Sequence, residues 1–148
     1  MVAALALFAC STPKPPPSSD ATRISLERGP CFGTCPIYKV EIKGDGSVTY
    51  TGERFVKITG EQHAQISREE VSALVAKFEK ADFFSLKDEY TAPVTDLPTY
   101  TLSVSFSGRN KTVTDYGGRM ADMPAVVTEL ENEVDRVAGT DQWVKGGE

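Results

Sequence analysis

A strict alternation of apolar and polar residues over Tyr100–Ser107 limits how this chain can fold more than any other feature. The apolar set is Tyr100, Leu102, Val104 and Phe106, and the hydroxyl-bearing set between them is Thr101, Ser103, Ser105 and Ser107. Successive side chains of a strand point to opposite faces of a sheet, so this segment predicts a strand with one buried and one solvated face. A sheet of this kind is covered by helices on one side only, which favours an α+β domain.

The same alternation predicts further strands, joined by hairpin turns. Asp45-Gly46 supplies the positive φ angles of a tight turn, and Gly108-Arg109-Asn110 provides a second turn. We also expect a short strand at Phe55–Ile58, where the alternation is weaker. The other expected strands are Ile24–Arg28, Tyr38–Lys43, Val48–Tyr50 and Lys111–Tyr116.

Two segments have helical periodicity. Ser67-Arg68-Glu69-Glu70 is a capping box, and an apolar stripe follows it to about Lys80. Pro124 suits the first turn of a last helix, which Gly139 would end. The acidic residues of this last helix are expected on its outer, solvated face: Glu129, Glu131, Glu133 and Asp135. The order is therefore β-β-β-(β)-α-β-β-α, which predicts an α+β fold with an antiparallel sheet and two helices packed on one face.

The N-terminus has the pattern of an exported, lipid-anchored protein. Residues 1–9 are apolar and uncharged. They are too short to span a bilayer, which needs about 20 residues, but they fit the apolar core of a signal peptide. Leu7-Phe8-Ala9-Cys10 resembles the lipobox of bacterial lipoproteins, which implies a truncated signal peptide over 1–9 and a lipidated Cys10. Residues 10–22 then form a Pro/Ser-rich tether, and residues 23–145 a single domain.

These features predict a location in the cell envelope. Ser11 stands where an Asp retains many bacterial lipoproteins in the inner membrane, so the resemblance implies the outer membrane, with the domain facing the periplasm. A net charge of −5 argues against a nucleic-acid partner, because such proteins normally carry a basic face. The expected partners are the membrane, through the lipid anchor, and an unidentified envelope protein or ligand.

The segment after the tether is similar to a known family. Ile24–Tyr38 contains the run CFGTCPIY and resembles bacterial secreted domains that share a CFGxCPxY signature. Gly44–Gly52, Asp115-Tyr116 and Pro124–Val144 look like the next hairpin, the last strand and the last helix of that family. The resemblance implies an α+β domain common on lipoproteins, and it implies no activity because the family is of unknown function.

Cys31 and Cys35 allow three interpretations. If Cys10 is acylated, the two remaining cysteines form a pair in an oxidising compartment, where a structural disulfide would pin the loop between the first two strands. The CxxxCP spacing is also similar to that of copper-delivery proteins of the Sco type, and His63 would then be a third ligand. A dithiol redox role for the same cysteines is the third possibility.

No catalytic set stands out in the sequence. The long segment Lys87–Pro98 carries Asp88, Tyr90 and Asp96, and a hydrolase that uses these carboxylates is one hypothesis. Tyr116–Arg119 is either a rim that binds something or a simple connection between strand and helix. We expect an envelope lipoprotein with a non-catalytic binding or accessory module and no cofactor. The alternatives are a copper or thiol-redox accessory protein and the hydrolase.

Overall fold

A computed structural model of the chain describes residues 19–147. The expected signal peptide at 1–9, Cys10 and most of the tether at 10–22 lie outside the described residues. The elements in chain order are β1 (Arg23–Arg28), β2 (Ile37–Lys43), β3 (Ser47–Arg54), β4 (Gly60–Gln65), α1 (Arg68–Lys80), η1 (Phe83–Ser85), β5 (Glu89–Thr91), β6 (Thr99–Phe106), β7 (Arg109–Tyr116), η2 (Gly118–Met120), α2 (Ala125–Ala138) and α3 (Asp141–Val144).

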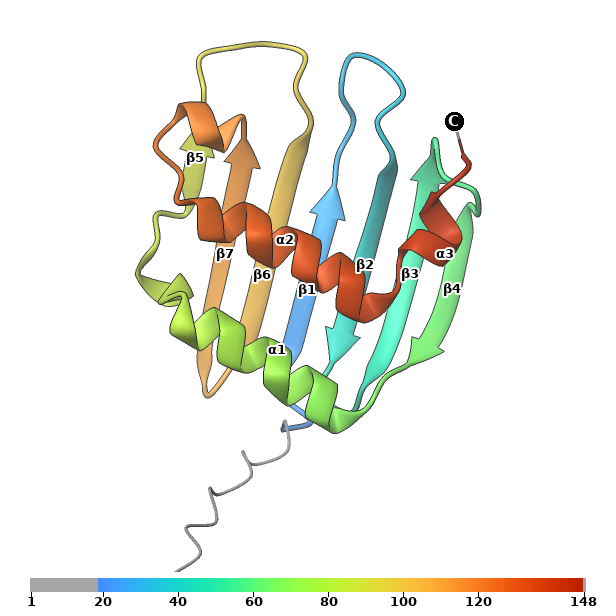
Figure 1. Cartoon of the computed structure of the whole chain (residues 1–148), viewed down its shortest axis with the longest axis vertical. Coiled ribbons are helices and arrows are strands. Elements are labelled where there is room, and N and C mark those ends of the chain that lie inside the picture. Colours follow the sequence, from blue (N-terminus) through green and yellow to red (C-terminus); the bar gives the residue numbers. More distant parts are fainter. Residues whose placement is uncertain (1–18, 148) are drawn as a thin grey trace, which may run out of the picture.

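The described part of the chain forms an α+β fold around one sheet. Seven strands lie in the order β4-β3-β2-β1-β6-β7-β5, and α1 and α2 cross the same face of the sheet (Figure 1). Every pairing is antiparallel except that of β5 with β7. The α+β class agrees with the prediction, and the sheet is mostly antiparallel as expected. The predicted element order and the packing of two helices are not matched exactly, because the parallel strand β5 and the short third helix α3 were not predicted.

The fourth strand does not lie where it was predicted. Phe55–Ile58 is a bend, because Phe55 has a φ of 54°, a left-handed conformation that ends a strand. The N–H of Ile58 donates to the carbonyl of Trp143 instead of to a strand, at 2.9 Å. The strand β4 begins after this bend and pairs with β3, so His63 lies on a sheet edge.

The expected loop Lys87–Pro98 also contains a strand. Residues Glu89–Thr91 form β5, which pairs in parallel with β7 and places Tyr90 opposite Asp115. Tyr90 is buried. Three residues are too few to show an alternation, which is why the sequence pattern did not reveal this strand.

The predicted start of α1 and the predicted end of α2 are confirmed. The Ser67 hydroxyl accepts a hydrogen bond from the Glu70 N–H, and the Glu70 side chain accepts one from the Ser67 N–H, so the capping box is complete. Gly139 ends α2 with a φ of 72°, a conformation that favours glycine. Pro124 is the N-cap of α2 rather than part of its first turn.

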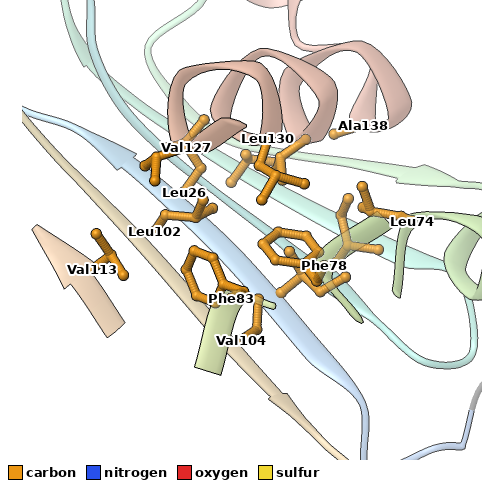
Figure 2. Packing of buried hydrophobic residues seen from close by; sticks show 14 of the residues in the cluster. Leu26, Leu74, Phe78, Phe83, Leu102, Val104, Val113, Val127, Leu130 and Ala138 are labelled. Carbon is orange, nitrogen blue, oxygen red and sulfur yellow. The ribbon is translucent and has the colours of Figure 1, made fainter. Parts of the chain in front are cut away.

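The core lies between the sheet and the two helices. Figure 2 shows Leu26 and Leu102 of the sheet facing side chains such as Phe78 of α1 and Leu130 of α2. The Trp143 ring is buried and stacks on Tyr50, with centroids 4.9 Å apart, and so anchors the C-terminal segment to the core. Among residues 19–147 no helix is both long and apolar enough to cross a membrane.

The two ends of the sheet differ. At one end, here called the loop end, the segments 29–36, 92–98 and 117–124 lie together (Figure 1). The Phe32 N–H donates to the carbonyl of Asp96 and so joins the first two segments, and the Gly29 N–H donates to Thr99 at the start of β6. At the opposite end, the Thr22 N–H donates a hydrogen bond to the carbonyl of Ser19, and the N–H of Gly44, in the β2–β3 turn, donates one to the carbonyl of Thr22. The described chain therefore enters the domain at the end of the sheet remote from the loop end (Figure 1).

Candidate functional site

A cleft of about 370 Å³ opens at the loop end of the sheet, beside α2. Its walls come from the ends of β1 and β7, the start of β6, the segment 92–98 and the turn η2. The lining residues are Arg28, Leu97, Pro98, Tyr100, Asp115, Gly117, Gly118, Arg119, Met120, Thr128, Glu131 and Asn132. A cleft of this size, with apolar walls and a few polar groups, is the usual form of a small-ligand site.

Glu131 is the most unusual residue of this cleft. The sequence prediction placed it on the outer face of α2, and this prediction is wrong, because Glu131 is 1% exposed. It lies four residues after Val127 and one after Leu130, both buried, and so falls on the inward face of the helix. The helical spacing alone predicts this inward position, but the charge of the side chain suggested a solvated position on the outer face.

The surroundings of Glu131 favour its neutral form. Burial, and then the charge of Asp115 beside it, raise the pKa of Glu131 to about 8, although the guanidinium of Arg28 opposes the shift. A hydrogen bond with the Asp115 side chain also favours the proton. Among the described residues, Oε1 of Glu131 is the buried side-chain polar atom that has no hydrogen-bond partner. An unpaired buried acceptor is costly and therefore calls for an explanation.

Asp115 belongs to the turn that shapes the cleft. It lies on β7 opposite Tyr100 of β6, it is 7% exposed, and its Oδ1 accepts a hydrogen bond from the N–H of Gly118 at 2.7 Å. Gly117 has a φ of 62°, which turns the chain sharply after the strand. A Cβ atom at Gly118 would lie 2.7 Å from the same Oδ1, so the turn needs glycine to approach the carboxylate.

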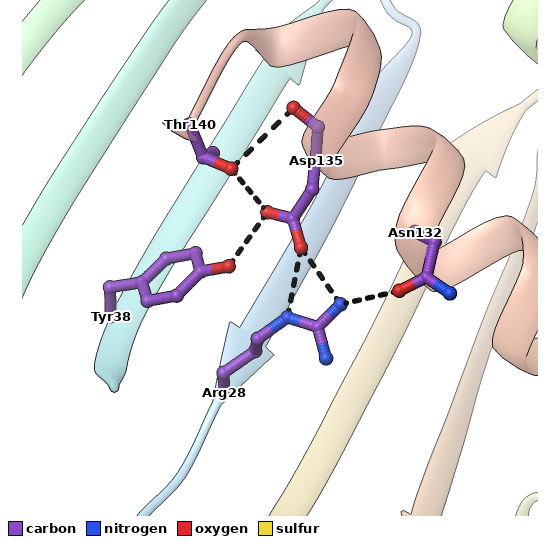
Figure 3. Close-up of polar contacts among 5 residues, drawn as sticks. All are labelled: Arg28, Tyr38, Asn132, Asp135 and Thr140. Atoms are coloured by element: carbon purple, nitrogen blue, oxygen red, sulfur yellow. Dashed lines mark hydrogen bonds and ion pairs between the residues drawn. The ribbon is translucent and has the colours of Figure 1, made fainter. Parts of the chain in front are cut away.

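A second acidic residue of α2, Asp135, is the centre of a polar network behind the cleft (Figure 3). Its Oδ2 accepts hydrogen bonds from Arg28, with Nε at 2.9 Å and Nη2 at 2.8 Å. Its Oδ1 accepts hydrogen bonds from the hydroxyls of Tyr38 at 2.8 Å and Thr140 at 2.7 Å. The prediction of an outer position was therefore wrong for Asp135 as well.

This network fixes Arg28 and leaves it little freedom to bind a ligand. Burial opposes the charged form of Arg28, but the Asp135 carboxylate outweighs this effect, so its pKa is raised. Burial, and then Asp135, also raise the pKa of Tyr38. The Arg28 guanidinium lies 4.5 Å from the centre of the Tyr100 ring and also donates to Asn132. Arg28 therefore forms a fixed wall of the cleft.

Exposed apolar side chains surround the loop end. Within residues 19–147, the large apolar side chains with high exposure are Phe32 at 86%, Met120 at 62% and Val94 at 39%. Each lies on a different one of the three segments at this end. Met120 also lines the cleft itself. Solvent-exposed apolar groups that gather around a cleft are typical of a binding surface.

Cys31 and Cys35 form a disulfide, with Cα atoms 5.8 Å apart, in the segment between β1 and β2. His63 is not brought to them. It lies on the edge strand β4, three strands from β1, which is about 14 Å of sheet width. Its Nε2 lies 2.7 Å from Glu61. In the described part of the chain, no group of three or more potential metal-binding side chains is found.

The loop residues named for the hydrolase hypothesis do not converge. Asp88 pairs with Lys111 at 2.6 Å, and the Tyr90 hydroxyl accepts a hydrogen bond from the Lys87 N–H. Asp96 lies beyond β5 at the loop end, is exposed, and has a φ of 72°. The carboxyl groups that do meet are instead those of Asp115 and Glu131, which come from β7 and α2.

A comparison with protein families gives one match. Residues 22–138 match the family model described as a domain of unknown function, DUF6438. This range holds the whole sheet, both long helices and every residue that lines the cleft. No curated protein matches the chain. Since the model covers most of the sequence, the chain belongs to the DUF6438 family.

Proposed function

We propose that this domain is a non-catalytic binding module of the cell envelope, and that the cleft at the loop end is its ligand site. The observation that carries this proposal is Glu131, a buried side chain with an unpaired oxygen in the wall of a cleft of about 370 Å³. A folded domain gains nothing from an unpaired buried acceptor. A ligand that supplies a hydrogen-bond donor would satisfy it.

The proposed location follows from the N-terminal sequence. Cys10 carries a lipid anchor in this proposal, in the outer membrane facing the periplasm, and the Pro/Ser-rich residues after it act as a spacer. The arrangement of the domain supports the idea, because Ser19 lies at the end of the sheet opposite the cleft. A tether that leaves from Ser19 would hold the cleft end away from the membrane, where a ligand can reach it.

The test uses a variant that fills the cleft. Thr128 lies on α2 in the cleft wall, so Thr128→Trp should occupy the space, while Ala125→Trp adds the same ring at an exposed position of the same helix. Amide NMR spectra of the purified chain are recorded with a fragment collection and with the small-molecule fraction of a bacterial envelope extract. Ligands should shift Gly117, Gly118 and Glu131 in the wild type and in Ala125→Trp only. Equal shifts in Thr128→Trp, or no shifts at these residues, would refute the proposal.

A second candidate is a hydrolase in which Glu131 gives a proton to a leaving group. A raised pKa near the working pH is what a general acid needs, and the pKa of Glu131 is raised to about 8. However, Glu131 and Asp115 share a hydrogen bond, whereas the two carboxyl groups of a glycosidase are about 5 Å or more apart. The N–H of Gly118 also occupies Asp115. Turnover of an envelope substrate that is lost in Glu131→Gln would favour this candidate.

A further inference from the structure

We infer that the cleft recognises a primary ammonium group carried on a compact apolar body. This inference rests on the proposed binding function and names the class of ligand. The ammonium would lie between the carboxyl groups of Glu131 and Asp115, with the apolar body against the walls of the cleft. A small alkylamine and the N-terminal residue of a peptide both offer this chemistry.

The charges around the cleft floor favour a cation. The groups that face Glu131 are Asp115 of β7, Arg28 of β1 and Asp135 of α2. Arg28 and Asp135 neutralise each other through hydrogen bonds of 2.8 and 2.9 Å. The Asp115 carboxylate is left without a basic side chain as its partner in the hydrogen bonds of the described residues. It shares a hydrogen bond with Glu131, and its Oδ1 accepts one from the Gly118 N–H. An ammonium would supply both the charge and the donor that this floor lacks.

The unpaired oxygen of Glu131 points to the same ligand. Glu131 lines the cleft, is 1% exposed, and its Oε1 has no hydrogen-bond partner among the described residues. An anionic ligand would meet two carboxyl groups. Among the described residues that line the cleft, the one cation outside the Asp135 network is Arg119, on the exposed rim. A neutral ligand could donate to Oε1 but would leave the charge of Asp115 unopposed.

The walls set the shape of the rest of the ligand. Leu97, Pro98 and Met120 give the cleft an apolar side, and Tyr100 adds a ring whose face Arg28 already covers. A body with a short aliphatic chain or a leucine side chain would bury apolar surface there, at about 25 cal/mol per Å². The volume of about 370 Å³ is at the small end of ligand sites.

Binding of an ammonium would ionise Glu131 and release its proton. With a pKa of about 8 in the free chain, Glu131 is mostly neutral at pH 6 to 7. The association constant for an amine should therefore rise by up to about tenfold per pH unit in this range. An alkylamine keeps its charge up to about pH 9, so its own titration does not produce this rise. The α-amino group of a peptide loses its charge around pH 7.7 to 8.0, so for a peptide the rise is expected only up to about pH 7.

The experiment measures the affinity of the purified full chain for matched probes by calorimetry at pH 6, 7 and 8. Hexylamine is compared with hexanol and hexanoate, which share its chain but not its head group. Leucyl-glycinamide is compared with its N-acetylated form, which lacks the ammonium. The expected result is binding of hexylamine that strengthens from pH 6 to 8, or of leucyl-glycinamide that strengthens from pH 6 to 7. Glu131→Gln should weaken this binding at least about tenfold at pH 8. Glu129→Gln, on the same helix but outside the cleft, should bind as the wild type does.

The arms separate the possible outcomes. Binding of the peptide but not of hexylamine assigns the site to peptide N-termini, and the reverse result assigns it to small amines. Hexanol or hexanoate that binds in the cleft as tightly as the amines would overturn the ligand class but leave the binding function intact. An amine affinity that Glu131→Gln does not change would also overturn the inference. The proposed binding function would fail on a separate result, namely NMR spectra with the fragment collection that show no ligand in the cleft.

Discussion

The carboxyl group of Glu131 on α2 is hydrogen-bonded to that of Asp115 on β7, in a cleft where each residue is less than a tenth exposed. The two residues come from elements that are separated in the chain by the turn η2 and meet only because α2 packs back across the sheet. Two acidic groups in contact share a proton readily, since both cannot be charged without repulsion. The account of this domain as a binding module depends on this pair.

The first prediction concerns how stability changes with pH. The pKa of Glu131 is raised to about 8 in the folded chain, whereas an unfolded chain has the ordinary value of about 4.3. The folded state therefore holds this proton more tightly, so the contribution of Glu131 to stability is fully present below about pH 4 and is lost as pH rises to about 8. Urea unfolding at pH 5, 6.5 and 8 should show the wild type losing a few kcal/mol, while Glu131→Gln loses much less. Parallel pH curves for the two proteins would contradict the prediction.

The second prediction concerns the network around Asp135. Replacing Asp135 by Asn keeps the shape of the side chain but removes the charge that balances Arg28, whose side chain is only 14% exposed. An unpaired buried charge destabilises a fold by about 3 kcal/mol. Chemical unfolding at pH 7 should show a loss of this order. The control is Asp141→Asn, at an exposed ion pair, which should cost less than about 1 kcal/mol. Equal effects of the two substitutions would mean that the network does not stabilise the fold.

The third prediction concerns the disulfide. Closing a loop of four residues' separation restricts the unfolded chain, so replacing both Cys31 and Cys35 by Ser should cost about 2 kcal/mol. The fold should persist, because the core lies elsewhere, between the sheet and the helices. Thermal unfolding with and without reductant measures the effect. If the wild type is fully reduced, as complete thiol labelling shows, and its unfolding temperature does not change, the disulfide does not stabilise the fold.

The fourth prediction concerns the anchor. If Cys10 is lipidated, Cys10→Ser should move the protein from the membrane fraction to the soluble periplasmic fraction, because the acyl chains on Cys10 are what holds the domain at the membrane in this proposal. The Cys31→Ser, Cys35→Ser double variant is the control and should remain with the membrane. A Cys10→Ser protein that stays in the outer-membrane fraction would refute the anchor.

Much of the fold could be predicted from the sequence, because the sheet is buried on one face only. The alternation from Tyr100 to Ser107 and the capping box at Ser67 express local geometry, and the structure confirms both. The strand β4 was missed because an edge strand buries little, and its residues are almost all polar. The strand β5 was missed because it has only three residues.

The candidate site was harder to predict than the fold. Its central residues are brought together from distant parts of the chain; Arg28 and Asp135, for example, are 107 positions apart. Which of these residues contact one another is decided by how the helices pack on the sheet, and it cannot be read from their spacing in the sequence. Glu131 was misassigned because charge was given more weight than its position on the inward stripe of α2. Tyr116–Arg119, for which the sequence left open a binding rim or a simple connection, supplies three residues that line the cleft: Gly117, Gly118 and Arg119.

The most direct test of the central claim is to titrate the Glu131 side chain itself. The chain is labelled with ¹³C, and the carboxyl resonance of Glu131, assigned by its loss in Glu131→Gln, is followed from pH 4 to 10. The account predicts a midpoint near pH 8. A midpoint near the ordinary value of about 4.3 would show that Glu131 is ionised at neutral pH, and the cleft would then lose the feature on which the proposed function depends.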